Sequence, residues 1–165
     1  MTIEDPNTIN SELVDALPKL LSISALDARG TFLLLPVEIR TTDMSELHPV
    51  KALLDCGATG SFINRDFVHS KRMNTQTLSQ NISVFNVDGS PNKAGQITEV
   101  IDVVLRYKTH SKRMLLAVSR LGKQSLILGY DWLKDHNPKI DWEKGKVEMT
   151  CCPLCYEGGC ALQKE

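Results

Sequence analysis

The sequence predicts an all-β domain that carries one or two short helices. Short runs rich in apolar and β-branched residues recur along the chain, and clusters of turn-forming residues separate them. One long segment, residues 97–107, alternates apolar and polar positions in the manner of a half-buried strand. After residue 28, helix signals are confined to two short stretches, at residues 65–70 and 129–136, so strands make up most of the expected fold.

Length and composition fit a single domain. The chain has 165 residues, of which 42% are hydrophobic and 24% charged, and its net charge is −1, as is ordinary for a globular protein. This charge gives no electrostatic basis for binding nucleic acid or a membrane surface, and no apolar run is long enough to cross a bilayer. The N-terminus is acidic and does not resemble a signal peptide, so we expect a cytoplasmic, intracellular protein.

The chain divides into three segments. Residues 1–28 are expected to be a leader or linker, partly helical, in which Ser11 could cap a short helix that Pro18 interrupts. Residues 29–150 hold the strand and turn signals and form the domain. Residues 151–165 are expected to be a flexible tail that contains four of the five cysteines.

Local signals place the elements of the domain. Asn64 has the side chain of a helix N-cap, and Gly129 opens a second helix that ends near Pro138. Trp132 and Trp142 are expected in the core. The expected strands lie at residues 31–40, 50–55, 61–63, 75–87, 97–107, 114–118 and 126–128, followed by a small hairpin over 140–142 and 146–149.

Residues 75–107 are predicted to form a long β-hairpin. Dense turn signals at residues 88–95 separate its two strands. It could be an ordinary surface hairpin, or it could be a mobile flap that closes over an extended peptide and excludes water.

The chain is organised around one stretch in which apolar residues run directly into an aspartate. Leu53 and Leu54 end a buried strand, Asp55 follows, and Gly57 lets the backbone turn sharply. An aspartate before a glycine is often only a turn residue. Here, however, apolar residues flank the loop on both sides, and a carboxylate held at the end of a rigid strand suits catalysis.

Two motifs carry a resemblance to a known family. The run Leu53-Leu54-Asp55-Cys56-Gly57-Ala58-Thr59, followed by Ser61-Phe62-Ile63, resembles the active-site loop of retroviral-type aspartic proteases. The run Ile127-Leu128-Gly129-Tyr130-Asp131-Trp132-Leu133 resembles their second motif. The protease of gypsy-type LTR retrotransposons is the best match, over about residues 30–150. The resemblance implies a closed retropepsin-like barrel of one lobe, with the predicted hairpin as its flap.

The resemblance also implies a function. The chain would be an aspartic endopeptidase that needs no cofactor or metal, acts on a polypeptide substrate and processes a retrotransposon polyprotein, and the places where it would act include retrotransposon particles. Only one loop of this type occurs in the chain, so a second catalytic carboxylate would come from another copy, in a homodimer whose site lies on the two-fold axis. The two carboxyls would share one proton, one acting as base and the other as acid.

Within the active-site loop, the resemblance assigns catalysis to Asp55 and substrate contacts to Gly57, Ala58 and Thr59. The position after the aspartate is normally Thr or Ser, whose hydroxyl bonds the partner loop across the dimer. Here it is Cys56, and a thiol is a weak donor. We therefore expect a weaker dimer.

Two other regions complete the expected site. Asp88 and Gly89 match the polar and glycine pair of the flap and are expected to contact substrate. Ile127, Leu128 and Gly129 are expected beside the active-site loop, near the dimer interface.

Three alternatives belong to other classes. The fold could serve as a dimerisation or peptide-binding module with little catalysis. Cys56 could be the nucleophile of a thiol enzyme, although the sequence positions no histidine base near it. The tail could bind zinc through Cys151, Cys152, Cys155 and Cys160, but no histidine follows at the spacing of a zinc knuckle.

Overall fold

The computed structural model describes residues 20–23 and 32–150. Most of the expected leader, with the helix predicted over residues 12–17, lies outside the described residues, as does the cysteine tail 151–165. Among the helices that are described, none combines the length and the apolar character needed to cross a membrane.

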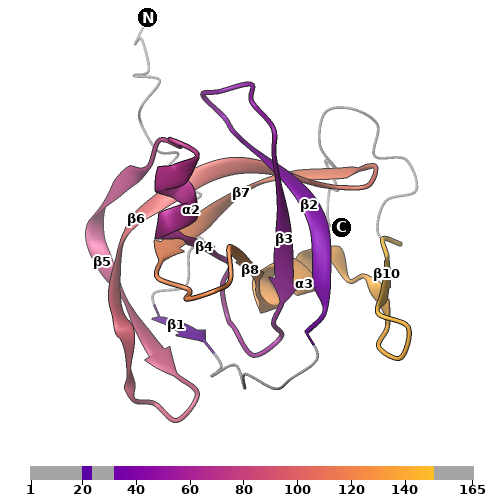
Figure 1. Cartoon of the computed structure of the whole chain (residues 1–165). Helices are drawn as coiled ribbons and strands as arrows, with labels where there is room; N and C mark the ends of the chain where they lie inside the picture. Colours follow the sequence, from indigo (N-terminus) through magenta and orange to yellow (C-terminus); the bar gives the residue numbers. More distant parts are fainter. Residues whose placement is uncertain (1–19, 24–31, 151–165) are drawn as a thin grey trace, which may run out of the picture.

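The described chain consists mainly of strands, with two short helices (Figure 1). The helices are α2, Arg65–Ser70, and α3, Tyr130–His136. The strands are β1 (Leu20–Ile23), β2 (Leu34–Thr41), β3 (His48–Leu54), β4 (Phe62–Asn64), β5 (Gln76–Asn86), β6 (Pro91–Tyr107), β7 (His110–Ser119), β8 (Leu126–Leu128), β9 (Lys139–Asp141) and β10 (Lys146–Glu148).

Six strands close into a barrel, in the order β6, β2, β3, β8, β4 and β7, and β7 pairs again with β6. The short strand β8 is inserted between β3 and β4, parallel to β3 and antiparallel to β4. Within the barrel, where β6 takes part from Val100 onward, closure leaves no free edge. The expected closed barrel is therefore confirmed, and the insertion of β8 brings the second motif against the strand that carries Asp55.

The hairpin of β5 and β6 projects from this barrel. From Val100 onward β6 pairs with β7, and within that part also with β2. Residues 91–99 of β6 pair only with β5. On its other edge β5 carries β1, which runs parallel to it. The hairpin is thus the centre of a three-stranded ribbon outside the barrel.

Two hydrophobic clusters hold the fold together. One fills the barrel and includes Ile39, Leu105 and Trp132. The other lies beneath the hairpin and the active-site loop and includes Phe62 and Ile97. The expected burial of Trp132 is confirmed, at 1% exposure, but that of Trp142 is wrong, since it is 67% exposed. Trp142 lies in the turn between β9 and β10, where the chain turns away from the barrel.

Both predicted helix starts are confirmed. The Asn64 side chain accepts a hydrogen bond from the Asp66 amide at 3.2 Å, which satisfies a free N–H of the first turn of α2. Gly129 caps α3 with an extended backbone. Two strands begin at least four residues earlier than expected: β6 at Pro91 instead of residue 97, and β7 at His110 instead of residue 114.

A buried pair of histidines lies where α3 packs on the start of β7. The rings of His110 and His136 meet edge to face at 4.6 Å, and His136 stacks on Trp132. His136 Nδ1 lies 2.8 Å from the Trp132 carbonyl oxygen, so Nδ1 carries the proton and donates. Burial lowers the pKa of His136 to about 4, against the weaker opposing effect of this hydrogen bond.

We therefore expect the free energy of unfolding to fall as the pH drops from about 6.5 to about 4. Over this range the unfolded chain binds a proton at position 136 that the folded chain excludes, and the full effect is at most about 3 kcal/mol. His136→Asn should flatten the acid side of a urea-denaturation series, because the amide can donate to Trp132 but does not titrate. His69→Asn, at an exposed position, should leave the acid side unchanged. Equal slopes for wild type and His136→Asn would contradict this account.

Candidate active site

Asp55 is held at the point where β3 leaves the barrel. Its backbone N–H donates to the Leu128 carbonyl at 3.0 Å, and its carbonyl accepts from the Ala58 N–H at 3.1 Å. The Gly57 N–H donates to the carboxylate Oδ1 at 2.9 Å. Asp55 is 8% exposed. The sequence expectation of a carboxylate at the mouth of a tight loop is met, and the loop itself supplies a donor that orients the carboxylate.

The second motif, residues 127–133, holds this loop in place through close backbone contacts, which we call the interlock. The Tyr130 N–H, in the first turn of α3, donates to the Ala58 carbonyl at 2.7 Å. A Cβ at Gly129 would lie 2.6 Å from the same carbonyl oxygen and still closer to that of Gly60. Only glycine therefore lets the two segments approach each other this closely.

Ser61 and Asp131 join the two motifs through side chains, which the sequence analysis did not foresee. The Ser61 hydroxyl accepts from the Gly129 N–H at 3.1 Å and donates to Asp131 Oδ1 at 2.8 Å. The same oxygen accepts from the Trp132 N–H at 2.7 Å. Burial raises the pKa of Asp131, although both hydrogen bonds act in the opposite direction. The clue in the sequence was positional, since Ser61 directly follows the turn of the Asp55 loop and Asp131 lies two residues after the cap Gly129.

The remaining loop residues differ in exposure. Cys56, Gly57 and Thr59 are exposed, and Cys56 is a free thiol. Ala58 is fully buried in the cluster beneath the loop, and its carbonyl accepts the hydrogen bond from the Tyr130 N–H. The substrate contacts expected of Gly57, Ala58 and Thr59 stay predictions.

Asp88 and Gly89 lie at the tip of the β5–β6 hairpin. Gly89 has a φ of +83° and its N–H donates to the Asn86 carbonyl at 2.9 Å, which closes the turn. Asp88 accepts from the Ser90 hydroxyl and backbone N–H, and these bonds lower its pKa. The two residues form a well-defined exposed turn, and their contact with substrate stays a prediction.

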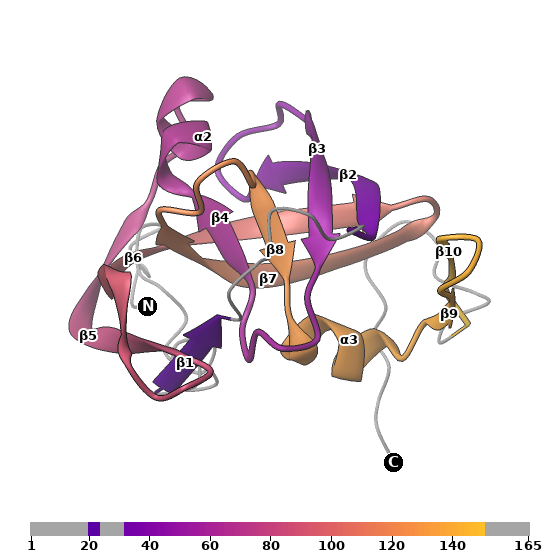
Figure 2. The ribbon, with the colours of Figure 1, turned by 60° about the horizontal axis from the view of Figure 1, so that its bottom comes forward.

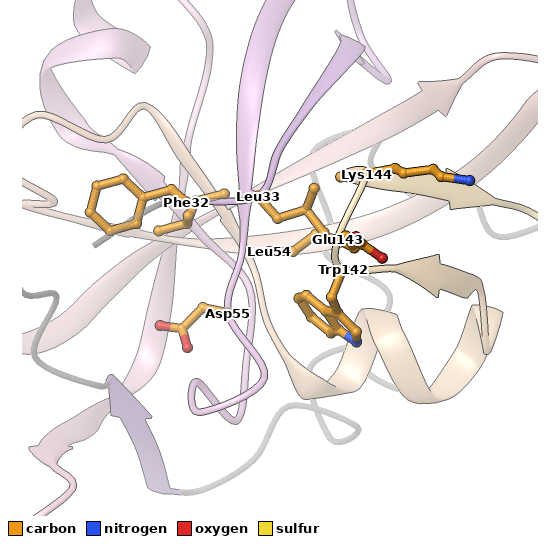
Figure 3. A pocket seen from close by; sticks show the side chains of 9 residues that line it. Phe32, Leu33, Leu54, Asp55, Trp142, Glu143 and Lys144 are labelled. Atoms are coloured by element: carbon orange, nitrogen blue, oxygen red, sulfur yellow. The ribbon is translucent and has the colours of Figure 1, made fainter. Parts of the chain in front are cut away.

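A pocket of about 440 Å³ opens beside Asp55. In Figure 3 the Asp55 carboxylate and the exposed Trp142 indole lie on either side of Leu54. Most of the lining side chains are apolar, and the charged ones come from the loop and the β9–β10 turn. The lining residues are Phe32, Leu33, Leu53, Leu54, Asp55, Trp142, Glu143, Lys144 and Gly145.

Metal-ligating side chains do not gather around Asp55. Over residues 20–23 and 32–150, no group of three or more His, Cys, Asp or Glu side chains has the arrangement of a metal site. The tail cysteines, for which zinc binding was considered, lie outside these residues.

Three features together define a retropepsin-like aspartic protease domain. They are a closed six-stranded barrel, an aspartate loop in close backbone contact with the start of α3, and a projecting hairpin. The chain belongs to the PEG10/RTL1 protease domain family, whose model matches residues 51–156.

Two solved structures are similar to this chain. The retroviral protease-like domain of Ddi1 from Leishmania major shares 21% identity, over 75% of this chain and 89% of that one, with a TM-score of 0.47. The EIAV protease complexed with the inhibitor HBY-793 shares 20% identity, over 71% of this chain and 99% of that one, also with a TM-score of 0.47.

The interlock predicts that Gly129→Ala will be far more damaging than an alanine at an unconstrained glycine. The added methyl meets backbone carbonyls that cannot move independently of the Asp55 loop, and we expect a loss of roughly 3 kcal/mol or more in the free energy of unfolding. Gly122→Ala is the control. No atom lies within 4 Å of its added methyl, but its φ is +60°, so the loss should be about 1 kcal/mol. Similar losses in urea denaturation would show that the interlock is not tight.

Proposed function

We propose that this protein is an aspartic endopeptidase in which two copies of Asp55 act on one water molecule in a homodimer. The observation that supports this most is the carboxylate of Asp55, held at the end of β3 by the Gly57 amide and by the interlock behind the loop. Rigid placement of a carboxylate beside a pocket is what general acid–base catalysis requires. Membership of a protease-domain family supports the same proposal.

The homodimer follows from the number of carboxylates. One Asp55 loop per chain provides one catalytic carboxyl, whereas the reaction needs a base and an acid together. A two-fold axis beside the exposed residue Cys56 would bring a second copy of the same loop into place. The pair would then hold one proton between them, because two adjacent negative charges repel each other.

The chemistry needs no group beyond these two carboxyls. The ionised Asp55 takes a proton from water as the water oxygen attacks the peptide carbonyl, and the neutral Asp55 gives its proton to the carbonyl oxygen. The tetrahedral intermediate then breaks its C–N bond as the amine nitrogen takes up a proton from one carboxyl of the dyad and a hydroxyl of the intermediate returns a proton to the other. Both products leave, and the pair again holds one proton.

The substrate would be an extended polypeptide. The β5–β6 hairpin offers a strand edge for β-addition, and the apolar lining of the pocket beside Asp55 suits an apolar side chain. The gypsy-type resemblance points to a retrotransposon polyprotein as the substrate, cut inside the cell.

Asp55→Asn tests catalysis directly. We expect loss of peptide cleavage by at least roughly a hundredfold, with the melting temperature and dimerisation retained, since an amide can still accept from the Gly57 amide. Asp66→Asn, an exposed acid in α2, is the matched control and should cleave as wild type does. The measurement is cleavage of a mixed peptide library in mildly acidic buffer at several protein concentrations. A folded wild-type dimer that cleaves no peptide at any concentration would favour the peptide-binding module instead.

Cys56→Thr tests the dimer. A hydroxyl donates a stronger hydrogen bond than a thiol, so we expect the dimer dissociation constant to fall by roughly tenfold, equivalent to about 1.4 kcal/mol shared between two symmetric bonds. Cys56→Ser should act in the same direction, and Cys56→Ala should not. Sedimentation equilibrium measures all three, and an unchanged or weaker Thr dimer would count against a cross-dimer role for this position.

A further inference from the structure

The outer edge of the hairpin strand β5 is occupied by a segment of the same chain. Strand β1 pairs with it in parallel register, with Leu20 opposite Ser83, Leu21 opposite Val84, Ser22 opposite Phe85 and Ile23 opposite Asn86. The other edge of β5 is already paired with β6. The edge that β1 covers is one of the two outer edges of the hairpin at which a peptide could add as a strand, the other being that of β6 over residues 91–99.

Strand β1 also lies close to the candidate active site. In Figures 1 and 2 it lies between the β5–β6 hairpin and the loop that follows β3. That loop carries Asp55. A peptide that pairs with the hairpin and reaches Asp55 would pass through the same space, and a strand edge accepts one partner at a time.

The direction of β1 relative to β5 is the one that a substrate peptide would have relative to one of the two hairpins of a symmetric dimer. A two-fold axis reverses one hairpin relative to the other, so a peptide that crosses the axis runs antiparallel to one hairpin and parallel to its mate. The parallel pairing of β1 with β5 reproduces the second of these arrangements.

The composition of β1 suits strand addition. Its four residues include three aliphatic side chains and one serine, with no charge, proline or glycine. The β5 residues opposite, 83–86, are also uncharged. Eight residues separate Ile23 from Phe32, where the described chain resumes, and a segment on so short a connection competes at an effective concentration on the order of millimolar.

We propose that residues 20–23 are an intramolecular occupant of the peptide-binding edge of β5 and compete with external peptides. The ligand class of this edge is an extended, uncharged, aliphatic segment. That the external ligand includes substrate rests on the proposed function, whereas the occupancy itself does not.

The experiment uses the full chain with Asp55→Asn, so that no cleavage complicates binding. Leu21→Pro with Ser22→Pro removes two backbone donors and disfavours the strand. Leu21→Val with Ser22→Thr is the matched control, which keeps the donors and the strand propensity. The first measurement is hydrogen exchange at residues 83–86, which should be faster in the proline variant than in the control.

The second measurement is fluorescence anisotropy with a labelled peptide of the sequence of residues 18–25. We expect the proline variant to bind it roughly tenfold more tightly than the control does, because the edge is then free in most molecules. In the cleaving protein, the same change should lower KM and leave kcat unaltered.

Equal exchange and equal affinity in the two variants would overturn the proposal. A difference in protection between the two variants that appears only as the protein concentration rises would also overturn it, because β1 would then pair between copies instead of within one. These outcomes are independent of catalysis. If wild type cleaves nothing but the proline variant gains affinity, the proposed function fails and the intramolecular occupancy stands.

Discussion

The contact of Gly129 with the Asp55 loop is the constraint on which the rest of the site depends. Because Gly129 has no side chain, the start of α3 can approach the Ala58 and Gly60 carbonyls closely enough for Tyr130 to donate to Ala58. That approach fixes where β8 lies, and β8 in turn separates β3 from β4 and closes the barrel. The position of the Asp55 carboxylate and the closure of the barrel therefore depend on the same contact between two motifs that are far apart in the sequence.

Burial shifts the pKa values of two titratable groups, Asp131 and His136, in opposite directions, so the two groups make the stability of the fold depend on pH in opposite ways. Burial raises the pKa of Asp131, so its protonated form suits the fold, and its stabilising contribution is lost as the pH rises through the folded-state pKa. Burial lowers the pKa of His136 to about 4, so its contribution is lost as the pH falls toward that value. The two contributions therefore change in opposite directions as the pH falls, and the loss at His136 is the one that applies between about 6.5 and 4.

The sequence predicted those features that depend on local chemistry. Asn64 as a cap, the strand ending at Leu54 and the helix after Gly129 each follow from a short pattern. Features set by tertiary contacts were missed. Trp142 is apolar and aromatic, but its turn projects from the barrel, so burial could not be inferred from residue type. The Ser61–Asp131 bond spans 70 positions, and β1 pairs with a strand some 60 residues away, which no local pattern reveals.

Strand β6 connects the rigid and the projecting parts of the molecule. Its C-terminal part pairs with β7 and, for four residues, with β2 as well, whereas residues 91–99 have only β5 as a partner. The change occurs at Glu99 and Val100, next to the point where the β5–β6 register shifts between Thr77 and Ile82. Irregular pairing weakens a ladder locally, so the ribbon can bend there without disturbing the barrel. A third strand such as β1 adds pairing to the projecting ribbon alone, so a hairpin that closes over Asp55, as the proposed function requires, would carry β1 with it.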